Sequence, residues 1–135
     1  MLRVGRYVIM EADNVRYFVN WARWAKALKE NAGWQCECCG STRKLESHHI
    51  IPYHLCPDES SYDIHNGVCL CHKCHMYVHN GSTAAFPRFG EDSKIPTRYK
   101  NNEDFGRLFS FMRAIVKDRF PEVYYGAKET ESDKQ

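Results

Sequence analysis

The sequence predicts a small α+β protein. Helical patterns of apolar residues lie on both sides of a short predicted strand that ends before Pro52. Hydrophobic residues make up 43% of the 135 residues and charged residues 27%, so the chain can form a core and is not a disordered polymer. All seven cysteines and all seven histidines fall between Cys36 and His79, which indicates that the central segment binds metal.

A strand or ordered arm is expected at residues 2–10, followed by a first helix at residues 15–31. Asp13 or Asn14 is the expected cap, because short polar side chains accept hydrogen bonds from the first helical N–H groups. Gly33 follows the last helical residue, as is typical of a helix end. Apolar side chains spaced by three and four residues predict the buried face: Phe18, Trp21, Ala22, Ala25 and Leu28.

A second helix is expected at residues 103–119, with Asn102 as its cap and Pro121 after its end. Its apolar spacing is that of a core face and does not suggest a cofactor site: Phe105, Leu108, Phe109, Met112, Ile115 and Val116. The polar tail at residues 126–135 is expected to be disordered. Residues 1–125 are therefore predicted to form a single domain.

A long surface connection is expected at residues 80–101, where Gly, Ser, Pro and Asn are frequent. Basic residues Arg88, Lys94, Arg98 and Lys100 alternate there with Phe86, Phe89 and Tyr99. This mixture suits nucleic-acid backbone and unstacked bases, or an ordinary loop held down by its aromatics. The basic residues of the first helix are read as a solvated face, with phosphate contact as the alternative: Arg16, Arg23, Lys26 and Lys29. Solvated loop positions are expected for Asp58, Glu59 and Asp63.

Two Cys-x-x-Cys pairs predict a structural zinc site. The four thiolates of Cys36, Cys39, Cys71 and Cys74 form a closed tetrahedral ligand set. Gly40 can adopt the positive φ that such a turn often needs. Cys38 is the rival ligand within the first pair, whereas Cys56 and Cys69 are read as small apolar fillers. The odd number of cysteines and the lack of a secretory signal argue for a reducing compartment rather than a disulfide framework.

The histidines predict a second metal site. His75 and His79 share one face of a helix that opens near Cys71, because they are four residues apart, and His72 competes with them as a ligand. His48 and His49 lie on a predicted strand, residues 44–51, where neighbouring side chains point to opposite faces. One of this pair can therefore complete the metal site, and the other is free to act as a base.

These residues resemble those of the HNH endonucleases. The resemblance rests on Leu45-Glu-Ser-His-His-Ile-Ile-Pro52, then Asn66-Gly-Val-Cys-Leu-Cys-His-Lys-Cys-His75, then His79. The resemblance covers about residues 36–80. The pattern is similar to that of the zinc-bearing branch of the ββα-metal, or His-Me finger, nucleases. It implies a small ββα-metal core with a structural zinc, flanked by an N-terminal and a C-terminal helix. The flanking helices carry no recognised motif.

The resemblance also implies a role for each position. His49 would be the general base that activates water, and His48 would bind the catalytic ion together with His75 and His79. Asn66 would either bind the metal or orient His49, and the orienting role is preferred because three histidines already suffice. The implied reaction is phosphodiester hydrolysis that leaves 5′-phosphate and 3′-hydroxyl ends.

The implied cofactors are a structural Zn²⁺ and one catalytic divalent ion, which is Mg²⁺, Mn²⁺, Ni²⁺ or Zn²⁺. Imidazole ligands favour a transition metal in the resting site. A histidine with an ordinary pKa of about 6.5 can take a proton from water at neutral pH. The expected partner is nucleic acid, with double-stranded DNA favoured, and no membrane. A cytoplasmic protein is expected, with a phage-encoded nuclease acting in a bacterial host as one setting.

Two other classes of function stay open. A zinc-stabilised nucleic-acid-binding module would need the four cysteines but not His48, His49 and His79 together. A protein-binding zinc domain would show no salt-dependent affinity for DNA. The net charge of +2 is too small to identify a nucleic-acid partner by itself.

Overall fold

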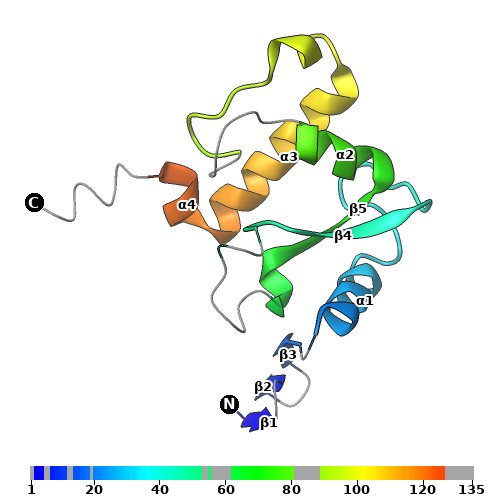
Figure 1. The fold of residues 1–135 in the computed structure, drawn as a ribbon, viewed down its shortest axis with the longest axis vertical. Coiled ribbons are helices and arrows are strands. Elements are labelled where there is room, and N and C mark those ends of the chain that lie inside the picture. The colour runs from blue at the N-terminus through cyan, green and yellow to red at the C-terminus, as the bar shows by residue number, and fades with distance from the viewer. Residues whose placement is uncertain are drawn as a thin grey trace, which may run out of the picture. The chain divides into compact units, whose positions relative to one another are not determined.

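The computed structural model describes residues 2–4, 7–11, 14–18, 20–52, 55, 62–80 and 89–126. The chain divides into two compact units, residues 1–72 and residues 73–135. Figure 1 shows their strands and helices. The mixture of short strands and helices confirms the predicted α+β class. The predicted disordered tail lies outside the described residues except for Gly126, as do Asp58 and Glu59. The single domain predicted for residues 1–125 stays a prediction.

The first unit contains two small antiparallel sheets and one helix. Strands β1 (Leu2–Val4), β2 (Tyr7–Glu11) and β3 (Asn14–Tyr17) form a three-stranded sheet in that order. Helix α1 (Trp21–Asn31) follows, and strands β4 (Leu45–His49) and β5 (Gly67–Cys71) then pair with each other. A short 3-10 helix, η3 (Ile64–Asn66), leads into β5.

The predicted start of the first helix was wrong by several residues. Asn14 begins strand β3, which pairs with β2, and Asp13 lies outside the described residues. The true cap is Asn20, whose side-chain oxygen accepts a hydrogen bond from the Arg23 amide at 3.0 Å. Val15 and Tyr17 belong to residue types that favour strands, and Asn20, which was not among the expected caps, is a residue type that suits the cap position.

The buried face of α1 also differs from the predicted face. Trp24, Ala25 and Leu28 are buried, whereas Trp21 is 53% exposed and Ala22 is also exposed. Helix α1 packs against both β4 and β5. Phe18 of the predicted face precedes the helix, but it is half-buried and packs against this cluster, so the prediction is wrong for Trp21 and Ala22 and omits Trp24.

The glycine that opens β5 allows α1 to approach the sheet. A Cβ atom added to Gly67 would lie 2.3 Å from Leu28 Cδ1 and 2.6 Å from Trp24 Cζ2. Real Cβ atoms do not come so close to their neighbours, so any other residue type would require the Leu28 and Trp24 side chains to shift. The absence of a side chain at this position therefore allows α1 to pack closely on the two-stranded sheet.

The second unit consists mainly of helices. Helix α2 (His72–Asn80) runs directly on from β5 across the boundary, and η4 (Thr97–Tyr99), α3 (Glu103–Arg119) and α4 (Pro121–Tyr125) follow. Asn102 caps α3 as predicted, with its side chain accepting from the Phe105 amide at 3.0 Å. The predicted core face of α3 is buried except for Ile115, which is half-buried. Pro121 does not only end α3, since it also opens α4.

Aromatic packing holds the described part of the long connection. Tyr99 stacks on Phe105 with ring centroids 4.3 Å apart, and Tyr77 of α2 meets both rings edge-on. Phe89 is buried and packs edge-on against Phe109 at 5.6 Å. These contacts favour the interpretation of Phe89 and Tyr99 as aromatics that hold down an ordinary loop. Phe86 lies outside the described residues.

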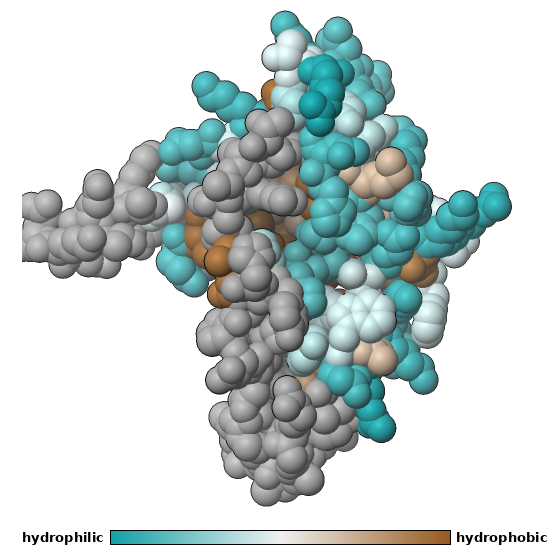
Figure 2. Space-filling view, viewed as in Figure 1, coloured by the Kyte–Doolittle hydropathy of each residue, from teal (hydrophilic) through white to brown (hydrophobic). Residues whose placement is uncertain are grey.

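The surface of the described residues is mostly hydrophilic in the view of Figure 2. A few large apolar side chains are exposed, among them Trp21, Trp34 and Met76. Within the described part of the chain, none of the helices is both long enough and apolar enough to cross a membrane.

Two glycine substitutions should change stability in opposite directions. Gly67→Ala should lower the free energy of unfolding by about 1–3 kcal/mol, because the new methyl group overlaps Leu28 and Trp24. Gly106→Ala in α3 should raise it by about 0.5–1 kcal/mol, since nothing lies within 4 Å of the added Cβ and alanine favours helix. Urea denaturation of both variants measures this, and equal stabilities would contradict the close approach of α1.

Candidate metal centre and active site

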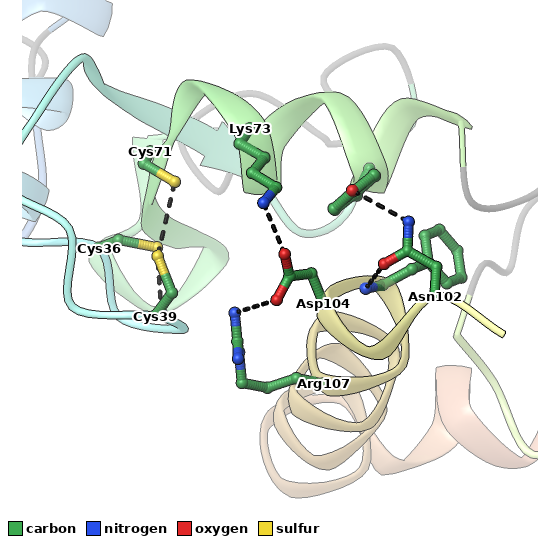
Figure 3. Close-up of polar contacts among 9 residues, drawn as sticks. Cys36, Cys39, Cys71, Lys73, Asn102, Asp104 and Arg107 are labelled. Atoms are coloured by element: carbon green, nitrogen blue, oxygen red, sulfur yellow. Dashed lines mark hydrogen bonds and ion pairs between the residues drawn. The ribbon is translucent and has the colours of Figure 1, made fainter. Parts of the chain in front are cut away.

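The four predicted zinc-binding cysteines lie together. One sulfur from each lies within 4.8 Å of the other three: Cys36, Cys39, Cys71 and Cys74. Cys36 and Cys39 come from the loop after α1, Cys71 ends β5, and Cys74 is in the first turn of α2. Figure 3 shows the side chains of Cys36, Cys39 and Cys71 turned toward one another. The cluster fits a zinc site within a ββα core.

The sulfur spacing suits one tetrahedral cation. Two thiolates bound to zinc at about 2.3 Å lie about 3.8 Å apart in tetrahedral geometry. The Cys39 and Cys71 sulfurs are 3.7 Å apart, which is far longer than a disulfide bond of about 2 Å. The first pair is held by a tight turn, in which the Gly40 amide donates to the Cys36 carbonyl at 2.9 Å and Gly40 has the predicted positive φ of 81°.

Backbone amides prepare Cys36 for the thiolate form. Burial opposes ionisation, but hydrogen bonds from the backbone of Cys39, Cys71 and Cys38 together hold the pKa of the Cys36 thiol below its ordinary value. One of these is the Cys39 amide, which lies 3.4 Å from the Cys36 sulfur. Burial and the neighbouring sulfurs raise the pKa of Cys39. Resistance of one thiol to ionisation is expected where several thiols lie close together, and a bound cation would favour the thiolate form.

The other two described cysteines, Cys38 and Cys69, are not part of this cluster. Cys69 is fully buried, and burial followed by the nearby Glu37 carboxylate raises the pKa of its thiol to about 11. Its backbone amide donates to a Glu37 carboxylate oxygen at 2.8 Å. Cys69 is therefore a neutral, apolar side chain, as its predicted filler role requires. Cys38 is half-buried, and Cys56 lies outside the described residues.

The structure also gathers three histidines. Nitrogen atoms of His48, His75 and His79 all lie within 4.8 Å of one another. The Nε2 atoms of His75 and His79 are 3.0 Å apart, close to the 3.3 Å or so expected for two nitrogens that share a zinc ion. His72 is not part of this group, because its Nδ1 pairs with the Glu46 carboxylate at 2.9 Å. The cluster has the donor set and spacing for a transition metal.

His49 has a different environment from its neighbour His48. Its ring stacks on the indole of Trp24, with centroids 4.1 Å apart and planes 16° apart. Tyr62 is tilted against both rings, 6.4 Å from His49 and 6.3 Å from Trp24. The Trp24 indole N–H donates to the Asp63 carbonyl at 2.9 Å in a buried hydrogen bond. The predicted helix face omitted Trp24, which is the side chain that contacts His49.

Asn66 is buried and holds the loop that follows β4. Its side-chain oxygen accepts from the Ile51 amide at 2.7 Å, and its side-chain nitrogen donates to the Ile51 carbonyl at 3.2 Å. Both ends of the amide are thus bound to one backbone position near His49. Asp63 is also buried, and its side chain caps η3 through the His65 amide at 2.9 Å. The prediction of a solvated Asp63 was wrong, because the carboxylate is needed as a helix cap.

The predicted nucleic-acid-binding residues are only partly described. Lys94, Arg98 and Lys100 are exposed, whereas Arg88 lies outside the described residues. Arg98 also donates to the Asn80 carbonyl at 2.9 Å and lies over the Tyr99 ring at 4.9 Å. Its guanidinium therefore has a structural role in addition to any interaction with a ligand.

Charged residues join α2 to α3 within the second unit. Lys73 and Arg107 both pair with the Asp104 carboxylate, at 2.5 Å and 3.2 Å (Figure 3). The hydrogen bond from Lys73 lowers the pKa of Asp104, and these groups are exposed. Exposed pairs of this kind contribute little to stability. They can still set the orientation of the helix that carries Cys74, His75 and His79.

Sequence comparisons agree with the geometry of the site. A family model described as HNH endonuclease matches residues 36–81, the segment that contains all the clustered ligands. A protein named Anaredoxin from Nostoc sp. (strain PCC 7120) is 37% identical over 57 residues, which cover 42% of this chain and 71% of that protein. No solved structure matches the chain.

The fold and the paired metal-ligand clusters define a small ββα-metal protein with a zinc-type cysteine cluster. The chain belongs to the HNH endonuclease family. This membership indicates a nuclease or a nucleic-acid-binding role.

Replacement of one clustered cysteine should destabilise the protein. Structural zinc sites supply about 10–16 kcal/mol of apparent binding energy that is coupled to folding. Cys36→Ser should therefore lose the thiolate-bound ion and aggregate or melt at a much lower temperature, as should the native chain in excess chelator. Cys38→Ser is the matched control and should melt normally. Zinc content by elemental analysis and Tm by calorimetry test this, and a normal Tm with full zinc content in Cys36→Ser would contradict it.

Proposed function

We propose that this protein is a metal-dependent endonuclease that hydrolyses phosphodiester bonds of nucleic acid, with double-stranded DNA as the favoured substrate. The observation that carries the proposal is the separation of two neighbouring histidines. His48 lies with His75 and His79, whereas His49 lies against Trp24. A purely structural zinc domain needs neither the three-imidazole cluster nor a second histidine beside it.

His49 is the proposed general base. One ring nitrogen would accept the proton of the attacking water, while Trp24 contacts the face of the ring and not its edge. General bases of this kind contribute about 10²–10⁴ in rate. Asn66 is the proposed positioning residue for the loop after β4, since it binds both backbone groups of Ile51.

His48, His75 and His79 would hold the catalytic ion. When bound, a divalent cation there supplies charge stabilisation for the phosphate and the leaving 3′-oxygen. Three neutral imidazoles suit Zn²⁺, Ni²⁺ or Mn²⁺ better than Mg²⁺. Cys36, Cys39, Cys71 and Cys74 would hold the structural zinc. We propose these two ligand sets as separate sites, with residues 1–125 acting as one nuclease domain.

Exposed basic residues are proposed to bind the nucleic-acid backbone. Lys94 and Lys100 carry charges in solvent, which is where phosphate neutralisation is effective. Arg98 and Arg88 are proposed for the same role. Such interactions would position the substrate without reading its sequence.

The alternative is a zinc-stabilised nucleic-acid-binding module without catalysis. Family membership alone supports it as well as it supports a nuclease. The alternative predicts one tightly bound ion per chain and no cleavage, whereas the proposed nuclease binds two ions and nicks DNA. Elemental analysis of His79→Ala separates them, since a nuclease should lose one of its two ions.

Removal of the proposed base should abolish cleavage without unfolding the protein. His49→Ala should lower the rate of plasmid nicking in Mn²⁺ by about 10²–10⁴ while keeping its metal content. His65→Ala is the matched control, because His65 is an exposed histidine outside the cluster. This variant should nick the plasmid at the native rate. Full activity of His49→Ala would show that another group is the base.

Neutralising exposed lysines should weaken binding in a salt-dependent way. The double variant Lys94→Gln/Lys100→Gln should bind duplex DNA less tightly at low salt. The slope of log Kd against log salt should fall by about two, because each lysine that neutralises a phosphate releases about 0.9 counterion on binding. Fluorescence anisotropy over a salt series measures this. An unchanged slope would place the nucleic-acid-binding surface elsewhere.

A further inference from the structure

One face of the His49 ring is covered by a residue that lies outside the HNH-matched segment. Trp24 belongs to α1, whereas the family model matches residues 36–81. The indole is completely buried, and its ring lies 4.1 Å from the imidazole at an angle of 16°. Its N–H is bound to the Asp63 carbonyl at 2.9 Å, so the indole itself is held in place. A fixed flat surface therefore covers one face of His49.

The register of the sheet leaves space for this stack. Gly67 of β5 is the residue paired with His49 of β4. A Cβ atom at Gly67 would lie 2.6 Å from the Trp24 ring, so only glycine lets the indole reach this point of the sheet. The close packing of α1 and the position of the indole over His49 thus depend on the same glycine.

A second interaction ties the helix to the same strand. The Ser47 hydroxyl donates to the Ala25 carbonyl at 2.9 Å. Ser47 and His49 are two residues apart and share one face of β4, because strand side chains alternate. Residues next to each other in α1, Trp24 and Ala25, therefore contact residues on one face of the strand.

From these interactions we infer that Trp24 is a positioning residue that fixes the ring plane of His49 for proton transfer, and that α1 is thereby part of the nuclease site. The inference rests on the proposed function. The torsion that turns an imidazole about its Cβ–Cγ bond is soft, with broad minima. Unrestrained, a half-buried strand histidine would sample several ring planes. Misplacement of a reacting group by about 1 Å can cost about 10²-fold in rate.

The test compares an aromatic and a non-aromatic replacement at position 24. Trp24→Phe keeps a flat ring, and Trp24→Met fills part of the space without one. Leu28→Val is the matched control, because Leu28 is an aliphatic residue buried in the same cluster and cannot stack on an imidazole. For each variant, kcat and KM for plasmid nicking in saturating Mn²⁺ are measured below its Tm.

Trp24→Met should lower kcat by about 10- to 100-fold with little change in KM. Trp24→Phe should retain kcat within about threefold, and Leu28→Val should retain it fully. A native kcat in Trp24→Met would overturn the inference, as would an equal loss in Leu28→Val or a loss confined to KM. An inactive native protein would instead refute the proposed nuclease function.

A second measurement does not depend on the folding of Trp24→Met. In the native protein, the ring protons of His49, assigned by their loss in His49→Ala, should resonate upfield of those of the exposed His65 and His72, because they lie over the indole. This shift should shrink in Trp24→Phe. Ring protons of His49 at the chemical shifts of exposed histidines would overturn the inference even if Trp24→Met fails to fold.

Discussion

The convergence of four sulfur atoms is the constraint on which the remaining structure depends. A two-stranded sheet such as β4–β5 is at best marginally stable by itself, and its ends must be held by something else. The cysteine cluster joins the loop after α1, the last residue of β5 and the first turn of α2. A cation bound there would fix the start of α2, and with it the helical spacing of His75 and His79. Burial and the neighbouring sulfurs raise the pKa of the Cys39 thiol, and a cation at this point would stabilise its thiolate.

Strand alternation then divides two adjacent histidines between two environments. His48 lies with the imidazoles of α2, whereas His49 lies on the aromatic side chains of α1 and the segment before η3. Identical side chains next to each other in sequence can therefore serve different chemistry. The proposed metal ligand, His48, needs to converge with two other imidazole nitrogens. The proposed base needs a fixed ring plane, and a buried indole supplies that without competing for a proton.

The aromatic packing of the second unit limits what its long connection can do. Phe89 and Tyr99 are used as anchors on α3, so they are not available as platforms for unstacked bases. The exposed lysines of the same segment keep their charge in solvent, where they suit phosphate binding. Within residues 89–101, the connection is better described as an anchored loop with basic residues than as a single-strand-binding surface.

Short-range spacing was enough to predict several features: the two Cys-x-x-Cys turns, the His75–His79 pair, the strand with His48 and His49, and the Asn102 cap of α3. Each follows from the geometry of one turn or one strand. Tertiary structure alone decided that Trp24 stacks on His49, that Gly67 makes room for it, and that Asp63 is buried, since these interactions join residues far apart in the chain. The first helix shows why: Asn14 and Asn20 are both acceptable caps, and the pairing of residues 14–17 with β2 decides between them. Local pattern cannot contain that information, because the partner strand is not part of the pattern.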